Sequence, residues 1–193
     1  MRTRDFLLEV NWPEELDISE AIQQYFISRG YELIGEGREQ MAFLSPRHTV
    51  VKVLGIGDEE REQIVKDYVA FFLQHQDNPY YPKIYNTGNF TLGDETYFVY
   101  EMEYLPNYIA NQEQDLDYLE KLIRAIEQKR VKEFLKTNPV PAGLDPKELK
   151  GLVEATVELE KHLGGQAPLD IGNLENLARR ADKHIVILDP YSL

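Results

Sequence analysis

The sequence predicts an α+β fold in two parts: an antiparallel sheet that carries one helix, then a mostly helical part. Three observations predict it. Short apolar runs bounded by turn residues fill much of residues 31–54 and 84–103. One amphipathic helix pattern lies between these stretches, and helical spacing dominates after Pro106. With 12 Tyr, 8 Phe and 42% hydrophobic residues, the 193-residue chain can build a core, so we expect a single domain.

The first part is expected to begin with a helix after Trp12-Pro13. Asp17 or Ser19 can cap this helix, and Gly30 is a suitable residue to end it. Asp58 to Gln76 has apolar residues at helical spacing and acidic residues at its start, which predicts a second helix. The expected strands are 31–35, 42–44, 50–54, 84–85 and 96–103, with a turn at 92–95 before the last one.

The second part is expected to hold two helices and a final strand. The first helix is expected over 116–135, followed by a proline-rich loop at 138–146. The second helix is expected over 146–163, with Asp145 as its cap and a proline at its first position. The apolar run 185–188 predicts a short strand. We therefore divide the chain into an N-terminal helical extension (1–29), a sheet lobe (30–105) and a helical lobe (106–193).

The net charge of −13 and the pI near 4.8 disfavour a general nucleic-acid or anionic-lipid surface, because both need clustered Lys and Arg. The chain has no cysteine, which excludes disulfides and thiol chemistry. The four histidines lie far apart and show no spacing typical of a metal site. The start of the sequence has no signal-peptide pattern and no stretch is apolar enough for a membrane span, so we expect a cytoplasmic protein.

Two features of the sheet lobe suit phosphate binding. Gly35-Glu36-Gly37 lies between two expected strands, where glycine lets backbone amides approach phosphate oxygens. Lys52 lies among strand valines, where an ammonium group is costly unless it meets an anion. Each has a structural alternative: a Gly-x-Gly turn is common in hairpins, and Lys52 could point outward from an exposed sheet face. A glycine turn followed by a strand lysine is the arrangement that holds nucleotide phosphates.

A carboxylate from the following helix is expected to hold Lys52. Glu62 is preferred and Glu60 comes next, while Glu59 and Asp67 are further candidates. The strand that follows runs through Glu101 and Met102 into an acidic linker that ends at Pro106. Backbone groups of such a hinge can pair with an adenine edge; the alternative is an edge strand that leads to a linker.

The most specific pattern lies near the end of the sequence. Asp170 is expected on a loop, Asn176 follows a few residues later, and Asp189 ends the next apolar strand. An Asp that orients or deprotonates a hydroxyl, with an Asn and an Asp that hold Mg²⁺, forms a phosphoryl-transfer constellation. Asn173 is the alternative to Asn176. Each residue alone is more typical of a turn or a helix cap.

Together these residues resemble the protein-kinase-like superfamily. The matching segments are 33–37 as glycine-rich loop, Val51-Lys52 as third-strand lysine, 100–102 as hinge, 170–176 as catalytic loop and 188–190 as metal-binding segment. The segment 77–85 and the closing Asp-Pro look similar to small kinases encoded by bacteriophages, which implies a host cytoplasm. The resemblance implies a two-lobe fold with a truncated helical C-lobe, ATP and Mg²⁺ as cofactors, and a protein substrate or regulated partner protein.

Three functions compete. The first is an ATP- and Mg²⁺-dependent protein Ser/Thr kinase-like enzyme. The second is a pseudokinase-like protein that binds a nucleotide or inhibits a partner; the family pattern is altered at Gln40, at Ala167-Pro168-Leu169 and after Asp189, with no activation segment. The third is a small-molecule phosphotransferase, which ranks last because such relatives usually carry a larger helical lobe.

Overall fold

The computed structural model describes residues 17–37, 40–54, 59–105, 113–163, 176–181 and 184–190. The chain forms two compact units. The first unit comprises residues 1–69 and 83–104, and the second comprises residues 70–82 and 105–193. The segment 70–82, which includes the end of a long helix, therefore belongs to the second unit although the first unit continues after it.

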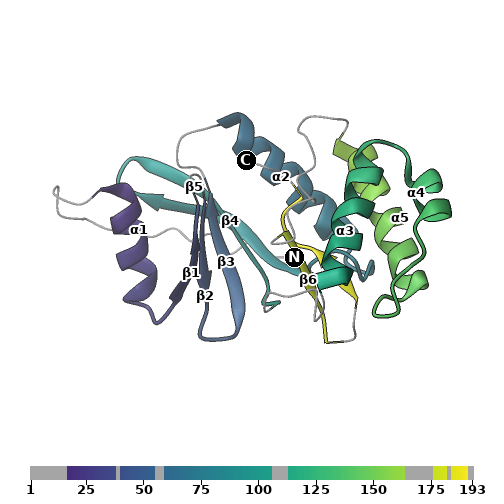
Figure 1. Cartoon of the computed structure of the whole chain (residues 1–193). Helices are drawn as coiled ribbons and strands as arrows, with labels where there is room; N and C mark the ends of the chain where they lie inside the picture. The colour runs from purple at the N-terminus through teal and green to yellow at the C-terminus, as the bar shows by residue number, and fades with distance from the viewer. Residues whose placement is uncertain are drawn as a thin grey trace. The chain divides into compact units, whose positions relative to one another are not determined.

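The first unit is built on a five-stranded antiparallel sheet (Figure 1). The strand order is β1-β2-β3-β5-β4, so β3 and β5 are neighbours although a helix separates them in sequence. The central strands β3 and β5 bury consecutive apolar residues, as expected for a sheet that is covered on both faces. The strands are β1 (Glu32–Glu36), β2 (Gln40–Leu44), β3 (Thr49–Leu54), β4 (Ile84–Leu92) and β5 (Glu95–Glu103).

Helix α1 (Ile18–Ile27) covers one face of this sheet (Figure 1). The carboxylate of Asp17 caps the helix by accepting hydrogen bonds from the backbone of Ser19 at 2.6 Å and Glu20 at 3.3 Å. Phe26 stacks on Phe43 of β2 with ring centroids 4.5 Å apart. The buried core on this face consists of Ala21, Ile22, Tyr25, Phe26, Met41, Phe43, Val51, Val53, Phe90, Leu92, Tyr97 and Val99.

Helix α2 (Glu59–Gln74) contacts the opposite face of the sheet through the part that belongs to the first unit. The hydroxyl groups of Tyr68 on α2 and Tyr100 on β5 lie 3.2 Å apart and both side chains are buried. The ammonium group of Lys66 lies 5.6 Å from the centroid of the Phe98 ring. The two sheet faces thus carry different helices, α1 on one and α2 on the other.

The second unit is mostly helical and ends in a two-stranded antiparallel hairpin. The buried residues of its helices recur at helical spacing, with Leu119, Leu122, Ile123 and Ile126 as one such stripe. Its elements are α3 (Glu113–Glu127), α4 (Val131–Thr137), α5 (Pro146–Leu163), β6 (Leu177–Arg179) and β7 (Ile185–Ile187).

The α+β class, with an antiparallel sheet and a mostly helical second part, is confirmed. The prediction of a single helix over 116–135 is wrong, because the helix is interrupted between α3 and α4. Lys129 takes a left-handed conformation there, with φ of 57°. The backbone N–H groups of Lys129 and Arg130 bond back to the carbonyls of Ile126 and Ala125, both at 2.8 Å, which closes the helix end. Within the described residues, no helix is both long and apolar enough to cross a membrane.

Candidate functional site

The register of β3 decides where Lys52 points. Lys52 lies directly opposite Ala42 of β2 and Tyr100 of β5. Its neighbours along the strand, Val51 and Val53, are buried in the core under α1. Successive side chains of a strand point to opposite faces, so Lys52 lies on the face that α2 contacts. The lysine is half-buried there rather than on a bare, outward-facing sheet surface.

Gly35 lies in the same cross-strand row as Lys52. Gly35 is opposite Ala42, and Ala42 is opposite Lys52. Adjacent strands are about 4.8 Å apart, so Gly35 and Lys52 are separated by about 10 Å across the sheet. A Cβ at Gly35 would meet the Cβ of Ala42 at 3.7 Å, which is ordinary contact. The row beside Lys52 therefore holds one residue without a side chain and one with a methyl group only.

Gly37 closes the β1–β2 hairpin. Its backbone N–H donates to the carbonyl of Gln40 at 2.9 Å. In the described part of the chain, the glycines with positive φ are Gly30 and Gly93, so neither Gly35 nor Gly37 is needed for a left-handed turn. The absence of side chains at these two positions is therefore not explained by backbone conformation.

The predicted carboxylate partner of Lys52 remains a prediction. The Glu62 carboxylate contacts the ammonium group of Lys66, one turn further along α2. Asp67 accepts a hydrogen bond from the side-chain amide of Gln63 at 2.7 Å. The side chains of Glu59 and Glu60 lie outside the described residues. The Glu62 side chain is 20% exposed and that of Lys66 is 39% exposed, so this ion pair is half-buried.

Glu101 and Met102 lie inside β5 and not in the linker after it. Each has cross-strand partners in both β3 and β4. The Glu101 carboxylate accepts a hydrogen bond from the Thr49 hydroxyl at 2.5 Å. Met102 is buried, and alternation puts it on the same sheet face as Lys52. The strand ends at Glu103, so backbone groups that are free of the sheet ladder are expected from Tyr104 onward.

The β6–β7 hairpin brings Asn176 and Asp189 together. The carbonyl oxygen of Asn176 accepts hydrogen bonds from the backbone of Leu188 at 2.7 Å and of Asp189 at 3.4 Å. Asp189 is only 7% exposed. A carboxylate at such a buried position needs compensating hydrogen bonds or a cation. Two of the predicted metal ligands are thus neighbours in space, although 13 positions separate them in sequence.

The segment 79–81 supports this hairpin from one side. The backbone N–H of Ile187 donates to the Tyr80 carbonyl at 2.9 Å. The guanidinium group of Arg180 donates to the carbonyls of Pro79 at 2.7 Å and Tyr81 at 3.1 Å. These bonds hold both strands of the hairpin against one stretch of backbone.

The first turn of α5 supports the hairpin from another side. The Glu148 carboxylate accepts from the backbone of Ile185 at 2.7 Å and lies 2.8 Å from the Nδ1 atom of His184. The Tyr80 hydroxyl donates to the same carboxylate at 3.4 Å. Burial, followed by the negative charge of Glu148, raises the pKa of Tyr80 to about 12. Burial and Glu158 likewise raise the pKa of Tyr81.

Asp170 and Asn173 lie outside the described residues, so the catalytic loop remains a prediction. The described residues contain no cluster of three or more His, Cys, Asp or Glu that could hold a metal. A Mg²⁺ site does not require one, because Mg²⁺ usually binds one or two protein oxygen ligands together with water and phosphate. The carboxylate of Asp189 and the amide of Asn176 are oxygen donors of this kind, so the two residues fit a Mg²⁺ ion.

Sequence reasoning missed the residues that support the site. Arg180 was visible as part of an Arg-Arg pair, but its two carbonyl partners are about a hundred positions away in sequence. Glu148 resembled any acidic residue in the first turn of a helix. The position of Arg180 or Glu148 in the sequence does not indicate which groups the side chain contacts.

Comparisons with protein families and with curated proteins found no match. Several solved structures are similar. One is "APH(2")-IIia" in complex with GDP and kanamycin, with a TM-score of 0.41 and 11% identity, covering 90% of this chain and 73% of that one. Another is a ternary complex of streptomycin, ATP and "APH(2")-IIa", with a TM-score of 0.35 and 15% identity, covering 91% and 72%. The site described above rests on this chain's own residues.

Proposed function

We propose that this chain is a protein-kinase-like phosphotransferase that uses ATP and Mg²⁺ and transfers phosphate to a Ser or Thr hydroxyl of a protein. The contact between Asn176 and Asp189 carries the proposal. Their backbones are joined by the Asn176 carbonyl, and both side chains offer the oxygen ligands that Mg²⁺ prefers. Each residue alone is unremarkable, but an Asn and a buried Asp side by side are the metal-binding half of a phosphoryl-transfer site.

The nucleotide-binding half of the proposal uses the sheet. Lys52 would bind phosphate oxygens, which would lie over the small residues Gly35 and Ala42 of the same cross-strand row. Gly37, at the hairpin end, has no side chain and would let the phosphates approach the backbone, while its own N–H group bonds to the Gln40 carbonyl. Met102, on the same face as Lys52, would pack against the base.

The ammonium group of Lys52 also needs a fixed orientation. We assign this role to Glu62, with Glu60 as the alternative, because both belong to α2, the helix on the sheet face of Lys52. Glu62 would exchange its contact with Lys66 for one with Lys52. Ion pairs one turn apart within a helix contribute about 0.3–0.5 kcal/mol when exposed, and this pair is half-buried.

The proposed roles in chemistry are divided among four residues. Asp189 and Asn176 would hold Mg²⁺, which neutralises the negative charge of the phosphates when it is bound. Asp170 would orient the acceptor hydroxyl and accept its proton. Lys52 would bind the phosphates through its ammonium group.

A turnover assay tests the proposal. ADP release from ATP and Mg²⁺ is measured with and without casein as a general protein acceptor, together with phosphate transfer to the casein. Asp189→Asn should abolish turnover while leaving the melting temperature close to that of the wild type. Asp94→Asn, in the exposed β4–β5 turn, is the matched control and should keep full activity. Full activity of Asp189→Asn would contradict the metal role.

The same assay separates the second candidate function. ATP binding without turnover by the wild type would indicate a nucleotide-binding regulator of a partner protein. The departures from the kinase-like pattern before Asp170 and after Asp189 favour this alternative.

A further inference from the structure

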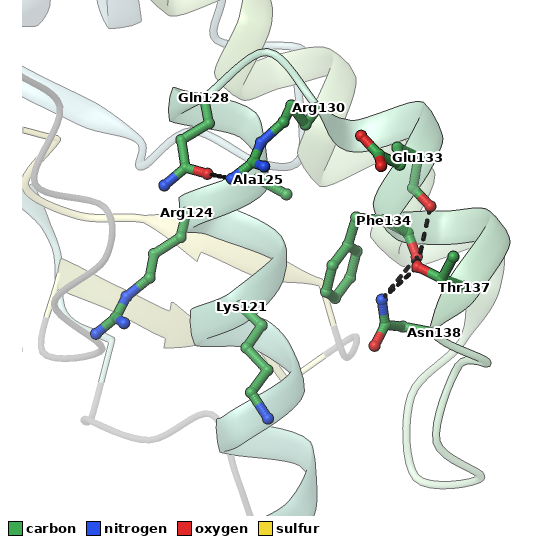
Figure 2. A pocket seen from close by; sticks show the side chains of 9 residues that line it. All are labelled: Lys121, Arg124, Ala125, Gln128, Arg130, Glu133, Phe134, Thr137 and Asn138. Atoms are coloured by element: carbon green, nitrogen blue, oxygen red, sulfur yellow. Dashed lines mark hydrogen bonds between the residues drawn. The ribbon is translucent and has the colours of Figure 1, made fainter.

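The second unit contains a groove that the proposed phosphotransfer site does not use. It lies between the second half of α3 and the short helix α4, and its volume is about 330 Å³. Figure 2 shows the ring of Phe134 on the wall between these two helices. The groove is lined by Lys121, Arg124, Ala125, Gln128, Arg130, Glu133, Phe134, Thr137 and Asn138.

The groove is basic in a strongly acidic protein. The segment 121–136 carries six Lys and Arg against two Glu, a net charge of +4. Because the whole chain has a net charge of −13, the remaining residues carry −17. Three of these cations, Lys121, Arg124 and Arg130, line the groove together with Glu133, so the lining carries a net charge of +2. The first half of α3 is acidic, so the positive charge is confined to the groove side of the segment 113–137, whose charges sum to zero. Such a local potential attracts an anionic ligand that the rest of the surface repels.

The cations of the groove can change partners. Lys121 pairs with Asp117 at 2.6 Å and Arg124 pairs with Glu120, both as exposed contacts one turn apart on α3. The side chains of Lys121 and Arg124 are 57% and 64% exposed. Exposed pairs of this kind are weak, so a ligand carboxylate can replace Asp117 or Glu120. The guanidinium group of Arg130 contacts the neutral amide of Gln128.

Lys129 adds a further cation at an unusual place. It occupies the left-handed position that ends α3, with φ of 57°, where glycine is the common residue. A strained backbone conformation in a non-glycine residue is a reason to look for function. Here the highly exposed ammonium group of Lys129 lies 3.9 Å from the Glu160 carboxylate on α5, next to the groove but not in its lining.

The groove also has an apolar component. Ala125 on α3 is buried and Phe134 on α4 is half-buried. α4 buries none of its residues, and Leu135 on it is 44% exposed. A ligand that combines carboxylates with an apolar side chain matches this surface better than a purely charged one.

We propose that the α3–α4 groove binds an acidic segment of a partner polypeptide, with Glu or Asp side chains on the groove cations and an apolar side chain against Phe134. Figure 2 shows the head groups of Lys121, Arg124 and Arg130 pointing in different directions, which suits carboxylates spaced along a chain better than one compact phosphate. A long polyanion such as nucleic acid would meet the −17 of the remaining surface. The groove volume of about 330 Å³ is at the small end of the range for ligand sites, so the groove suits a short segment.

A binding measurement with charge-neutral variants tests the proposal. The probe is a fluorescein-labelled peptide of Glu-Glu-Leu repeats, titrated with the full chain at low ionic strength and followed by anisotropy. The groove variant replaces Lys121, Arg124 and Arg130 with Gln. The matched control replaces Lys147, Lys150 and Lys161 on α5 with Gln, which changes the net charge equally at exposed positions. Gln has a helix propensity close to that of Lys and Arg, so both variants should fold.

The groove variant should bind the peptide about tenfold more weakly, as expected when three exposed ion pairs are lost, and the control should bind like the wild type. Equal weakening in both variants, or no saturable binding to the wild type, would overturn the proposal. Tighter binding of a short oligothymidylate or of inorganic phosphate would assign the groove to those ligands instead. Sedimentation gives the oligomeric state. If the wild type and the control are dimers and the groove variant is a monomer, the groove binds a second copy of the chain instead.

The absence of cysteine gives an independent test of position. Thr137→Cys places a single thiol in the groove for a fluorophore, and Lys150→Cys places one on α5. The peptide should change the emission of the first label and leave the second unchanged. A change at the α5 label alone would contradict the proposed position.

Discussion

The hydroxyl oxygen of Tyr80 lies 2.0 Å from the point where a side chain at Gly151 would place its Cβ. Gly151 is inside α5, where glycine is normally unfavourable by about 1 kcal/mol relative to alanine. Here Gly151→Ala should destabilise the protein by about 1–3 kcal/mol, because the added methyl group displaces the Tyr80 ring. Denaturant unfolding measures the change.

The double variant Gly151→Ala with Tyr80→Ala supplies the control. Removal of the ring should relieve the overlap, so the double variant should be more stable than the sum of the two single effects predicts. Simple additivity would contradict the proposed contact.

Gly35→Ala should separate folding from ligand binding. Its added methyl group meets Ala42 at an ordinary distance, and alanine is more favourable than glycine within a strand, so stability should stay equal or rise slightly. If phosphates lie above this row, the same methyl group should weaken ATP binding. Unfolding and ATP titration are measured on the same sample, and unchanged ATP affinity would argue against a phosphate at Gly35.

Arg180→Gln should destabilise the second unit. It removes a guanidinium group that bonds two backbone carbonyls, and hydrogen bonds of charged groups contribute about 1.5–3 kcal/mol. Arg180→Lys should rescue little, because an ammonium group lacks the planar fork. Arg47→Gln, in the exposed β2–β3 turn, should change stability by less than about 0.5 kcal/mol. A change at Arg180 as small as at Arg47 would contradict its structural role.

Alkaline pH should weaken the contact between Tyr80 and α5. The folded-state pKa of Tyr80 is about 12, above its usual value of 10.0, because burial and Glu148 disfavour the phenolate. The folded state therefore favours the neutral phenol, and this contribution is complete below pH 10 and is lost as the pH rises from 10 to 12. Tyr80→Phe should make the fall in melting temperature over this range less steep. An identical pH profile in both proteins would contradict the assignment.

Local signals predicted some elements of this fold well. The Asp145-Pro146 pair indicated the first residue of α5, and the structure gives the expected helix over 146–163. The apolar stripe of α2, with residues such as Tyr68 and Phe72, is buried as expected. These features depend on neighbours along the chain, so the sequence alone carries them.

Non-local features were beyond sequence reasoning. The end of α3 depends on a left-handed Lys129, and lysine gives no signal for that conformation. Strand β6 exists because it pairs with β7, and its residues Leu-Ala-Arg lack the β-branched apolar run that predicted β7. For the candidate site, sequence spacing predicted Lys52, Asn176 and Asp189, and their roles stay predictions. The sheet face of the lysine and the contact between the other two required the register and the hairpin.

The most direct test of the nucleotide site is a thermal-shift titration with ATP, with and without Mg²⁺. A ligand that binds the native state raises the melting temperature by mass action. We predict a Mg²⁺-dependent rise for the wild type and for Lys147→Ala, an exposed control on α5, and its loss in Lys52→Ala and Asp189→Asn. No rise at millimolar ATP, or an equal rise in Lys52→Ala, would contradict a nucleotide site built on these residues.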